Sequence, residues 1–226
     1  MRTINFVKMS AAGNDFVVID HRRKTLRMDF KKIAQTLCGR KRSIGADGIL
    51  FLEKSKKAKM RMRIFNPDGS EAQMCGNGVR CLAKFAADRK IAGPKFSIQT
   101  PAGIIEVNVK GDWVKAKMIE PNAVRILNSF DHLDVESAGR TIRFHRHFSP
   151  GGTNADFAVI RPGNRLDVRT YERGVEDETL ACGTGAVAST LIYEEREGMT
   201  SPATVRTRSG EKLKVYFKKV GGNFKD

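Results

Sequence analysis

Residues 75–78 read Cys-Gly-Asn-Gly, and residues 182–185 read Cys-Gly-Thr-Gly, 107 positions further along the chain. The string Thr-Pro-Ala-Gly at 100–103 is echoed at the same offset by Thr-Arg-Ser-Gly at 207–210. Two motifs in the same order at one offset indicate an internal repeat. The chain is therefore predicted to contain two similar halves, each with one cysteine of the pair.

The predicted halves are residues 1–118 and residues 119–226. A third echo is expected between Gly-Asn-Asp-Phe-Val-Val-Ile at 13–19 and Thr-Asn-Ala-Asp-Phe-Ala-Val-Ile at 153–160. Its offset of 141 implies 34 extra residues in the first half, mostly between residues 21 and 60.

Each cysteine motif is predicted to open a helix. Apolar residues recur at helical spacing after both motifs, from Val79 to Ala86 and from Ala186 to Ile192. Apolar, β-branched segments around them predict strands, among them one covering residues 5–20. Turns are expected at 111–112 and 221–223, and Met60 and Met62 are expected to point inward from a strand. The pattern predicts an α+β fold.

Composition limits the possible functions. The 226 residues are 40% hydrophobic, enough for a buried core, which excludes a disordered chain, a collagen-like repeat and a disulfide scaffold. No run of about 18 apolar residues occurs, and a secretory signal is not expected. Four cysteines without pairwise spacing fit a reducing cytoplasm. The net charge of +16 raises nucleic-acid binding as an alternative. Aromatic residues do not alternate with the basic runs, which favours an ordinary solvated surface.

The paired cysteines suggest acid–base chemistry. The field at a helix N-terminus is expected to lower a thiol pKa, and the adjacent glycines admit a ligand carboxylate close to the backbone. Two such thiols on opposite sides of one ligand suit inversion of a carbon, because one removes a proton and the other supplies one. Cys38 and Cys81 are instead predicted to be buried small side chains, and the Cys75-x5-Cys81 spacing is not that of a zinc site.

Motifs spread over most of the chain carry a family resemblance. They are Gly-Asn-Asp-Phe at 13–16, Gly-Ala-Asp-Gly at 45–48, Phe-Asn-Pro-Asp-Gly-Ser at 65–70, Met-Cys-Gly-Asn-Gly-Val-Arg-Cys at 74–81, Gly-Thr-Asn at 152–154, Tyr-Glu-Arg-Gly at 171–174 and Glu-Thr-Leu-Ala-Cys-Gly-Thr-Gly at 178–185. With them the sequence resembles the diaminopimelate epimerase family. The resemblance implies two pseudo-symmetric halves, each a curved antiparallel sheet or barrel around a central helix.

The same resemblance implies an isomerase of lysine and peptidoglycan precursor synthesis. Such an enzyme converts LL-2,6-diaminoheptanedioate to the meso form without cofactor or metal, as a homodimer with no specific nucleic-acid partner and no membrane association. Cys75 and Cys182 would be its acid–base residues. The implied substrate-binding residues are Asn14, Asn66, Gly76, Asn77, Asn154, Glu172, Arg173, Gly183 and Thr184.

Some family features are expected to be missing. The Gly-Asn-Pro-His string that usually lies between the halves, and the apolar strand after it, have no evident counterpart around Asn128. The family's closing strand is also expected to be absent, and Gly48 stands where some members have Gln. Either segments are omitted from the sequence, or this is a genuinely shortened homologue.

Two alternative functions remain at this point. A related racemase acting on proline or hydroxyproline would usually carry Pro-Cys-Gly-Thr at the second motif, whereas Ala181 precedes Cys182 here. The other alternative is a basic nucleic-acid-binding protein, which the charge alone supports.

Overall fold

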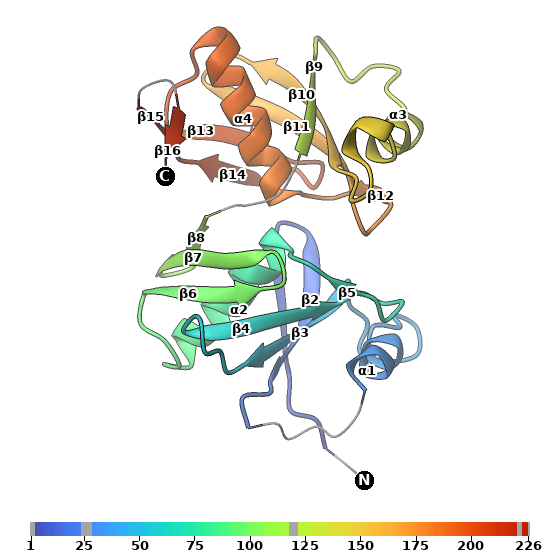
Figure 1. Ribbon diagram of the computed structural model, residues 1–226, viewed down its shortest axis with the longest axis vertical. Helices are drawn as coiled ribbons and strands as arrows, with labels where there is room; N and C mark the ends of the chain where they lie inside the picture. The colour runs from blue at the N-terminus through green and yellow to red at the C-terminus, as the bar shows by residue number, and fades with distance from the viewer. Residues whose placement is uncertain (1–2, 24–28, 118–121, 221–222, 226) are drawn as a thin grey trace. The chain divides into compact units, whose positions relative to one another are not determined.

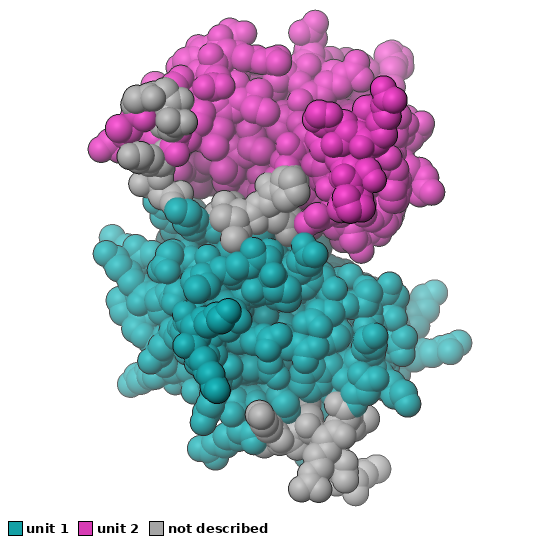
Figure 2. All heavy atoms as spheres, viewed as in Figure 1, with its two compact units in different colours: residues 1–119 teal, residues 120–226 magenta. Residues whose placement is uncertain are grey.

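A computed structural model describes residues 3–23, 29–117, 122–220 and 223–225. The chain divides into two compact units, residues 1–119 and residues 120–226 (Figure 2). The predicted boundary at 118/119 lies outside the described residues. In the described ranges no helix is long and apolar enough to cross a membrane.

Unit 1 is built on a mixed sheet in the order β1-β2-β3-β4-β6-β7-β8, with the short β5 paired to β4 (Figure 1). Most neighbours run antiparallel, but β2 and β3 run parallel, as do β4 and β6. Two helices accompany the sheet. The elements are β1 (Val7–Ala11), β2 (Asn14–Asp20), α1 (Phe30–Leu37), β3 (Gly48–Glu53), β4 (Met60–Phe65), β5 (Glu71–Ala72), α2 (Gly76–Asp88), β6 (Lys95–Thr100), β7 (Gly103–Lys110) and β8 (Trp113–Ala116).

Unit 2 has a sheet in the order β14-β13-β11-β10-β9, with β12 paired to β11, and a separate hairpin of β15 and β16. Helix α4 lies across this sheet (Figure 1). The elements are β9 (Asn122–Leu127), α3 (Val135–Arg143), a 3-10 turn (Arg146–Phe148), β10 (Asn154–Arg161), β11 (Arg165–Glu172), β12 (Asp177–Thr179), α4 (Gly183–Glu197), β13 (Ala203–Arg206), β14 (Lys212–Val215), β15 (Lys218–Val220) and β16 (Asn223–Lys225).

The two units repeat one topology. The series β2-α1-β3-β4-β5-α2-β6-β7 matches β9-α3-β10-β11-β12-α4-β13-β14 in order and in the direction of every pair in the main path. The predicted α+β class and two similar halves are confirmed. The sheets expected to be antiparallel are mostly so, but each also contains two parallel pairs.

The third sequence echo is misplaced. The counterpart of β2 in the second unit is β9, not β10. Strand β2 runs parallel to β3 and is connected to it by α1, and β9 runs parallel to β10 and is connected to it by α3. Helix α1 and strand β3 also have counterparts, α3 and β10. The 34 extra residues inferred for the first half are therefore not an insertion. Similar strand composition in β2 and β10 produced a false match.

Strand β9 also corrects the expectation of a missing strand. Residues 122–127 pair in parallel with β10, with Asn122 opposite Asn154. The apolar strand expected after the Gly-Asn-Pro-His string is thus present, but it comes before Asn128 rather than after it. Near the end of the described chain, β15 and β16 form a short antiparallel pair.

Turns explain other differences from the prediction. Residues 5–20 form two strands, because Ala12 and Gly13 both take positive φ and make the two-residue turn of a hairpin. The turn at 111–112 is confirmed, with Lys110 opposite Trp113. Residues 221–222 of the turn predicted at 221–223 lie outside the described residues.

The cores contain the side chains predicted for them. Met60 and Met62 are buried from β4 against α2, as expected. Cys38 and Cys81 are buried, which is also confirmed. Burial raises the pKa of Cys38 to about 11 and that of Cys81 to about 12, so both remain thiols at neutral pH.

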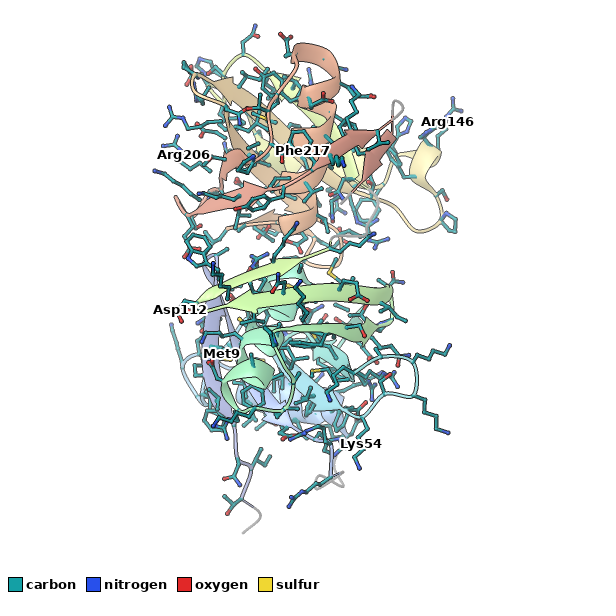
Figure 3. The ribbon with its side chains drawn as sticks, turned by 90° about the vertical axis from the view of Figure 1, so that its left-hand side faces the viewer. Met9, Lys54, Asp112, Arg146, Arg206 and Phe217 are labelled. Atoms are coloured by element: carbon teal, nitrogen blue, oxygen red, sulfur yellow. The ribbon has the colours of Figure 1, made fainter. Side chains whose placement is uncertain are left out.

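The basic residues lie mainly on the outside. Lys54 points away from the body of unit 1, and Arg206 extends from the edge of unit 2, where it pairs with Asp167 (Figure 3). Lys56, Lys57 and Lys59 are exposed as well. This arrangement agrees with a solvated basic surface.

Candidate active site

The first thiol caps a helix. Cys75 has extended backbone angles and precedes α2, and its Sγ accepts a hydrogen bond from the N–H of Gly78 at 3.4 Å. Glycine at 78 permits close packing, since a Cβ there would lie 3.0 Å from Leu50. The thiol therefore uses one of the N–H groups that a helix leaves unpaired at its start.

An amide network lies beside this helix start. Asn77 is buried, and its Nδ2 donates to Oδ1 of Asn14 at 2.5 Å. Asn14 in turn donates to Oδ2 of Asp47 at 3.1 Å, and Arg80 donates to Oδ1 of Asn77. Both ends of the Asn14 amide are thereby fixed. The predicted residues Asn14 and Asn77 thus lie together, although they are 63 positions apart.

Asn66 occupies a turn directly after β4. Its Nδ2 donates to Oγ of Ser70 at 3.0 Å, and its backbone N–H donates to the carbonyl of the same residue at 2.9 Å. These bonds hold the turn, and they do not test a substrate-binding role. At Gly48 a Cβ would lie 3.0 Å from the carbonyl oxygen of Phe65, so this strand position suits glycine.

The second thiol is held in the same way. Cys182 precedes α4 with extended backbone angles, and its Sγ accepts from the N–H of Gly185 at 3.4 Å. The hydroxyl of Thr184 lies 3.2 Å from the same sulfur. Only 7% of Cys182 is exposed. The repeat in sequence is therefore a repeat of the thiol and helix geometry.

Amide groups gather at this thiol too. Nδ2 of Asn154 lies 3.3 Å from Oγ1 of Thr184 and 3.9 Å from Sγ of Cys182. The same Nδ2 donates to Oδ1 of Asn122 at 3.1 Å, and the backbone N–H of Arg173 donates to Oδ1 of Asn154 at 2.8 Å. The structure thus brings together four predicted residues: Asn154, Arg173, Cys182 and Thr184.

The expected low pKa is wrong for Cys182. Burial raises its pKa well above the ordinary thiol value, and the negative charges of Glu172 and Asp156 raise it further. The bonds from Thr184 and Gly185 favour the thiolate but do not outweigh burial. Cys182 is therefore a thiol at neutral pH in the substrate-free protein. Glu172, predicted as a substrate contact, is close enough to act electrostatically on this sulfur.

Two site residues are not indicated by the sequence motifs. Asn122 follows Pro121 and precedes an apolar run, so this pair is the sequence signal for it, several residues before the place around Asn128 where the family string is expected. Asp47 belongs to the Gly-Ala-Asp-Gly motif, but nothing in that string alone shows that it orients Asn14. Sequence spacing cannot reveal such a cross-strand contact.

The described residues contain no group of three or more His, Cys, Asp and Glu placed to hold a metal. Each unit instead offers a thiol at a helix start, with glycine backbone and neutral amides beside it. Such a set can bind a carboxylate through N–H groups and exchange a proton through sulfur.

Comparison with known proteins gives this geometry a family. The family model described as diaminopimelate epimerase matches the chain twice, over residues 6–120 and residues 114–225. This chain belongs to the diaminopimelate epimerase family. The predicted isomerase class is confirmed, and the double match agrees with the repeated topology.

Relatives within the family cover nearly the whole chain. Diaminopimelate epimerase of Methanothrix thermoacetophila is 38% identical over 96% of this chain and 90% of its own length. The protein named diaminopimelate epimerase from Aquifex aeolicus is 37% identical over 95% of this chain and 90% of its own length. The alignment with the Methanothrix protein spans 256 residues, more than the 226 present here, so that relative has residues without a counterpart in this chain.

Solved structures share the fold at low identity. A phenazine biosynthesis protein of the PhzF family from Bacillus anthracis superposes with a TM-score of 0.72, at 15% identity, covering 99% of this chain and 94% of its own. A probable proline racemase from Agrobacterium radiobacter gives 0.67 at 13% identity, over 98% and 87%. These similarities show the fold alone and do not favour the proline racemase alternative.

Proposed function

We propose that this epimerase-family protein interconverts LL- and meso-2,6-diaminoheptanedioate with two thiols and no cofactor. The observation that carries the proposal is the repeated arrangement of Cys75 and Cys182, each at a helix start with neutral amides beside it. Relatives bearing the epimerase name at 37–38% identity support the substrate.

In the proposed reaction one sulfur, as thiolate, takes the proton from the α carbon while the other thiol gives its proton to the opposite face. The C–H bond broken and the C–H bond formed balance, and the two sulfurs exchange protonation states. A buried thiol at Cys182 is in the right form to be the donor in one direction. In the reverse direction the two sulfurs exchange these roles. An enzyme that works in both directions therefore needs each sulfur to be accessible as thiol and as thiolate.

The surrounding residues would bind and orient the substrate. N–H groups at the helix starts, at Gly76 and Gly183, are suited to a carboxylate. Asn14, Asn77, Asn154 and Thr184 present neutral groups already fixed by hydrogen bonds, which reduces the entropy lost on binding. Of the remaining assigned residues, Asn66 would add an amide, and Glu172 and Arg173 would contact the distal ammonium and carboxylate.

Exchange of the α proton tests the proposal. In heavy water the parent protein is expected to introduce deuterium at the α carbon of the substrate while forming the epimer. Cys75→Ser and Cys182→Ser are each expected to lower turnover by at least 10³-fold, on the order expected for loss of an acid–base group. Cys38→Ala is the control, because that buried thiol takes no part. Undiminished turnover in the double serine variant would refute the two-thiol mechanism.

Other features of the proposal follow from the family resemblance. We expect a homodimer acting in the cytoplasm on a small diamino dicarboxylate, with no specific nucleic-acid partner. Sedimentation measures the oligomeric state. Fluorescence anisotropy with duplex and single-stranded probes at about 0.15 M salt tests nucleic-acid binding, which for a basic surface should be weak and salt-sensitive.

A further inference from the structure

Beneath the second thiol lies a buried carboxyl group that the proposed reaction does not use. Asp156 is fully buried on β10, and its Oδ1 accepts a hydrogen bond from Oγ1 of Thr170 at 2.6 Å. Its Oδ2 is buried without a hydrogen-bond partner among the described residues. An isolated carboxylate is costly in such a place, so a function for it must be sought in what it touches.

Asp156 touches the backbone that holds Cys182. A Cβ at Gly185 would lie only 1.9 Å from Oδ1 of Asp156, so the carboxyl group packs directly against that residue. The N–H of Gly185 is the group that donates to Sγ of Cys182. The carboxyl oxygen and the sulfur are thus separated by a single glycine of the helix start.

The first unit places apolar side chains at the same point. Gly78, which donates to Cys75, is in contact with Leu50 of β3 and Ile64 of β4. Leu50 and Ile64 are opposite each other in the sheet, as Asp156 and Thr170 are in unit 2. The repeat therefore has an apolar pair under one thiol and a carboxyl–hydroxyl pair under the other. Packing of the helix does not require the carboxyl group, since an apolar pair fills the same place in unit 1.

We propose that Asp156 is a positioning residue that acts on Cys182 through its charge. While the Asp156 carboxyl group is neutral, the Cys182 thiol is able to ionise. Once Asp156 is negatively charged, it suppresses ionisation of that thiol. The physical basis is repulsion between two negative groups in a water-poor site. Burial raises the pKa of Asp156 to about 7 despite the bond from Thr170, and the charge of Glu172 adds to the rise. Asp156 therefore changes charge near neutral pH, and the pKa of Cys182 is expected to change with it.

The groups around Asp156 support this reading. Glu172 from β11 and Cys182 at the start of α4 are the titratable groups that interact with it. From β9, Val124 and Ile126 pack on the α4 side of the sheet and carry no charge. Helix α3 packs on the side of Ala155 and Phe157, which is the opposite face.

Titration of the Cys182 thiolate tests the inference without substrate. Ultraviolet thiolate absorption is followed with pH in a Cys38→Ala/Cys75→Ser/Cys81→Ala background, in which Cys182 is the one remaining thiol of the chain. Asp156→Asn keeps the shape and removes the charge, so the Cys182 midpoint is expected to fall by about one pH unit, a tenfold change in thiolate fraction below the midpoint. The matched control, Asp167→Asn, removes a carboxylate already paired with Arg161 and Arg206 and is expected to leave the midpoint unchanged.

A carboxyl group with a purely structural role would leave the Cys182 midpoint where it is. An unchanged Cys182 midpoint in folded Asp156→Asn would overturn the inference. The double variant Asp156→Leu/Thr170→Ile copies the apolar pair of unit 1 and should shift the midpoint in the same direction. Should both variants fail to fold, infrared spectra of the parent decide. A protonated carboxyl band that disappears between pH 5.5 and 8.5 supports the inference, and spectra without such a change refute it.

The inference rests on the proposed role of Cys182, but its test is separate. A shifted thiol in a protein that does not turn over 2,6-diaminoheptanedioate would count against the proposed function alone. Normal epimerisation with an unshifted thiol would count against the role of Asp156 alone.

Discussion

Replacing Asp156 with asparagine should stabilise the protein increasingly as pH rises. The folded protein holds this carboxyl proton up to about pH 7, whereas an ordinary aspartate loses it near 3.8. Between these values the unfolded chain is ionised and the folded one is not, so the stability of the parent falls as pH rises. Above pH 7 the loss is complete. Asparagine cannot ionise, so the variant does not lose this stability as pH rises.

The size of the effect follows from the two pKa values. A difference of about three units corresponds to about 4 kcal/mol, at 1.36 kcal/mol a unit. Roughly 3 kcal/mol of this develops between pH 5 and pH 8.5. The new amide N–H₂ takes the place of an oxygen that has no described partner, which costs about 1–3 kcal/mol, but that cost does not depend on pH. The difference in unfolding free energy between variant and parent therefore changes with pH only through the ionisation of Asp156.

Urea unfolding at pH 5 and pH 8.5 measures this change. At a slope of about 2–3 kcal/mol per molar urea, the midpoint difference should grow by about 1 M in favour of the variant. Asp167→Asn serves as control. Burial raises the pKa of Asp167, but the bonds from Arg206 and Arg161 lower it overall, so its effect is constant between these pH values. An equal variant-minus-parent difference at both pH values would refute the claim that Asp156 is protonated at neutrality.

Three further outcomes are expected. Asn122→Ala should lower kcat/KM about 10–100-fold without unfolding the protein, measured by epimer formation and circular dichroism, because it removes an amide from the second thiol site. Gly139→Ala should cost about 1–3 kcal/mol in urea, since its Cβ would lie 2.3 Å from Tyr171, whereas Gly93→Ala, with open space around it, should be near neutral. Burial raises the pKa of Asp15, but its basic partners lower it overall, so Asp15→Asn should lose stability relative to the parent above about pH 4 and converge with it in acid.

Local patterns were sufficient for the parts of this protein that repeat. Cysteine followed by Gly-x-Gly and an apolar helical stripe led directly to α2 and α4, and alternation placed Met60 and Met62 inside. These features depend on neighbours within a few residues, where periodicity and backbone freedom are informative. The motif strings then identified the family and most of the residues that gather around each thiol.

Long-range pairing was predicted less well. Strands β2 and β10 look alike in composition, yet β2 corresponds to β9, because strand order depends on hydrogen bonds between segments far apart in sequence. The same limitation hid Asn122 beside Asn154 and Asp47 beside Asn14. No spacing rule within one segment indicates which residue of another strand will lie opposite it.

The sequence by itself determined that this protein repeats one design with a cysteine at a helix start in each half, because the duplicated motif and its helices are encoded locally. Only the tertiary structure decided the chemical state of the thiol at Cys182. A helix start favours its thiolate, but burial and the nearby charges of Glu172 and Asp156 favour the thiol. Desolvation and charge proximity depend on what the whole unit packs around the sulfur, and those quantities exist only once the chain has folded.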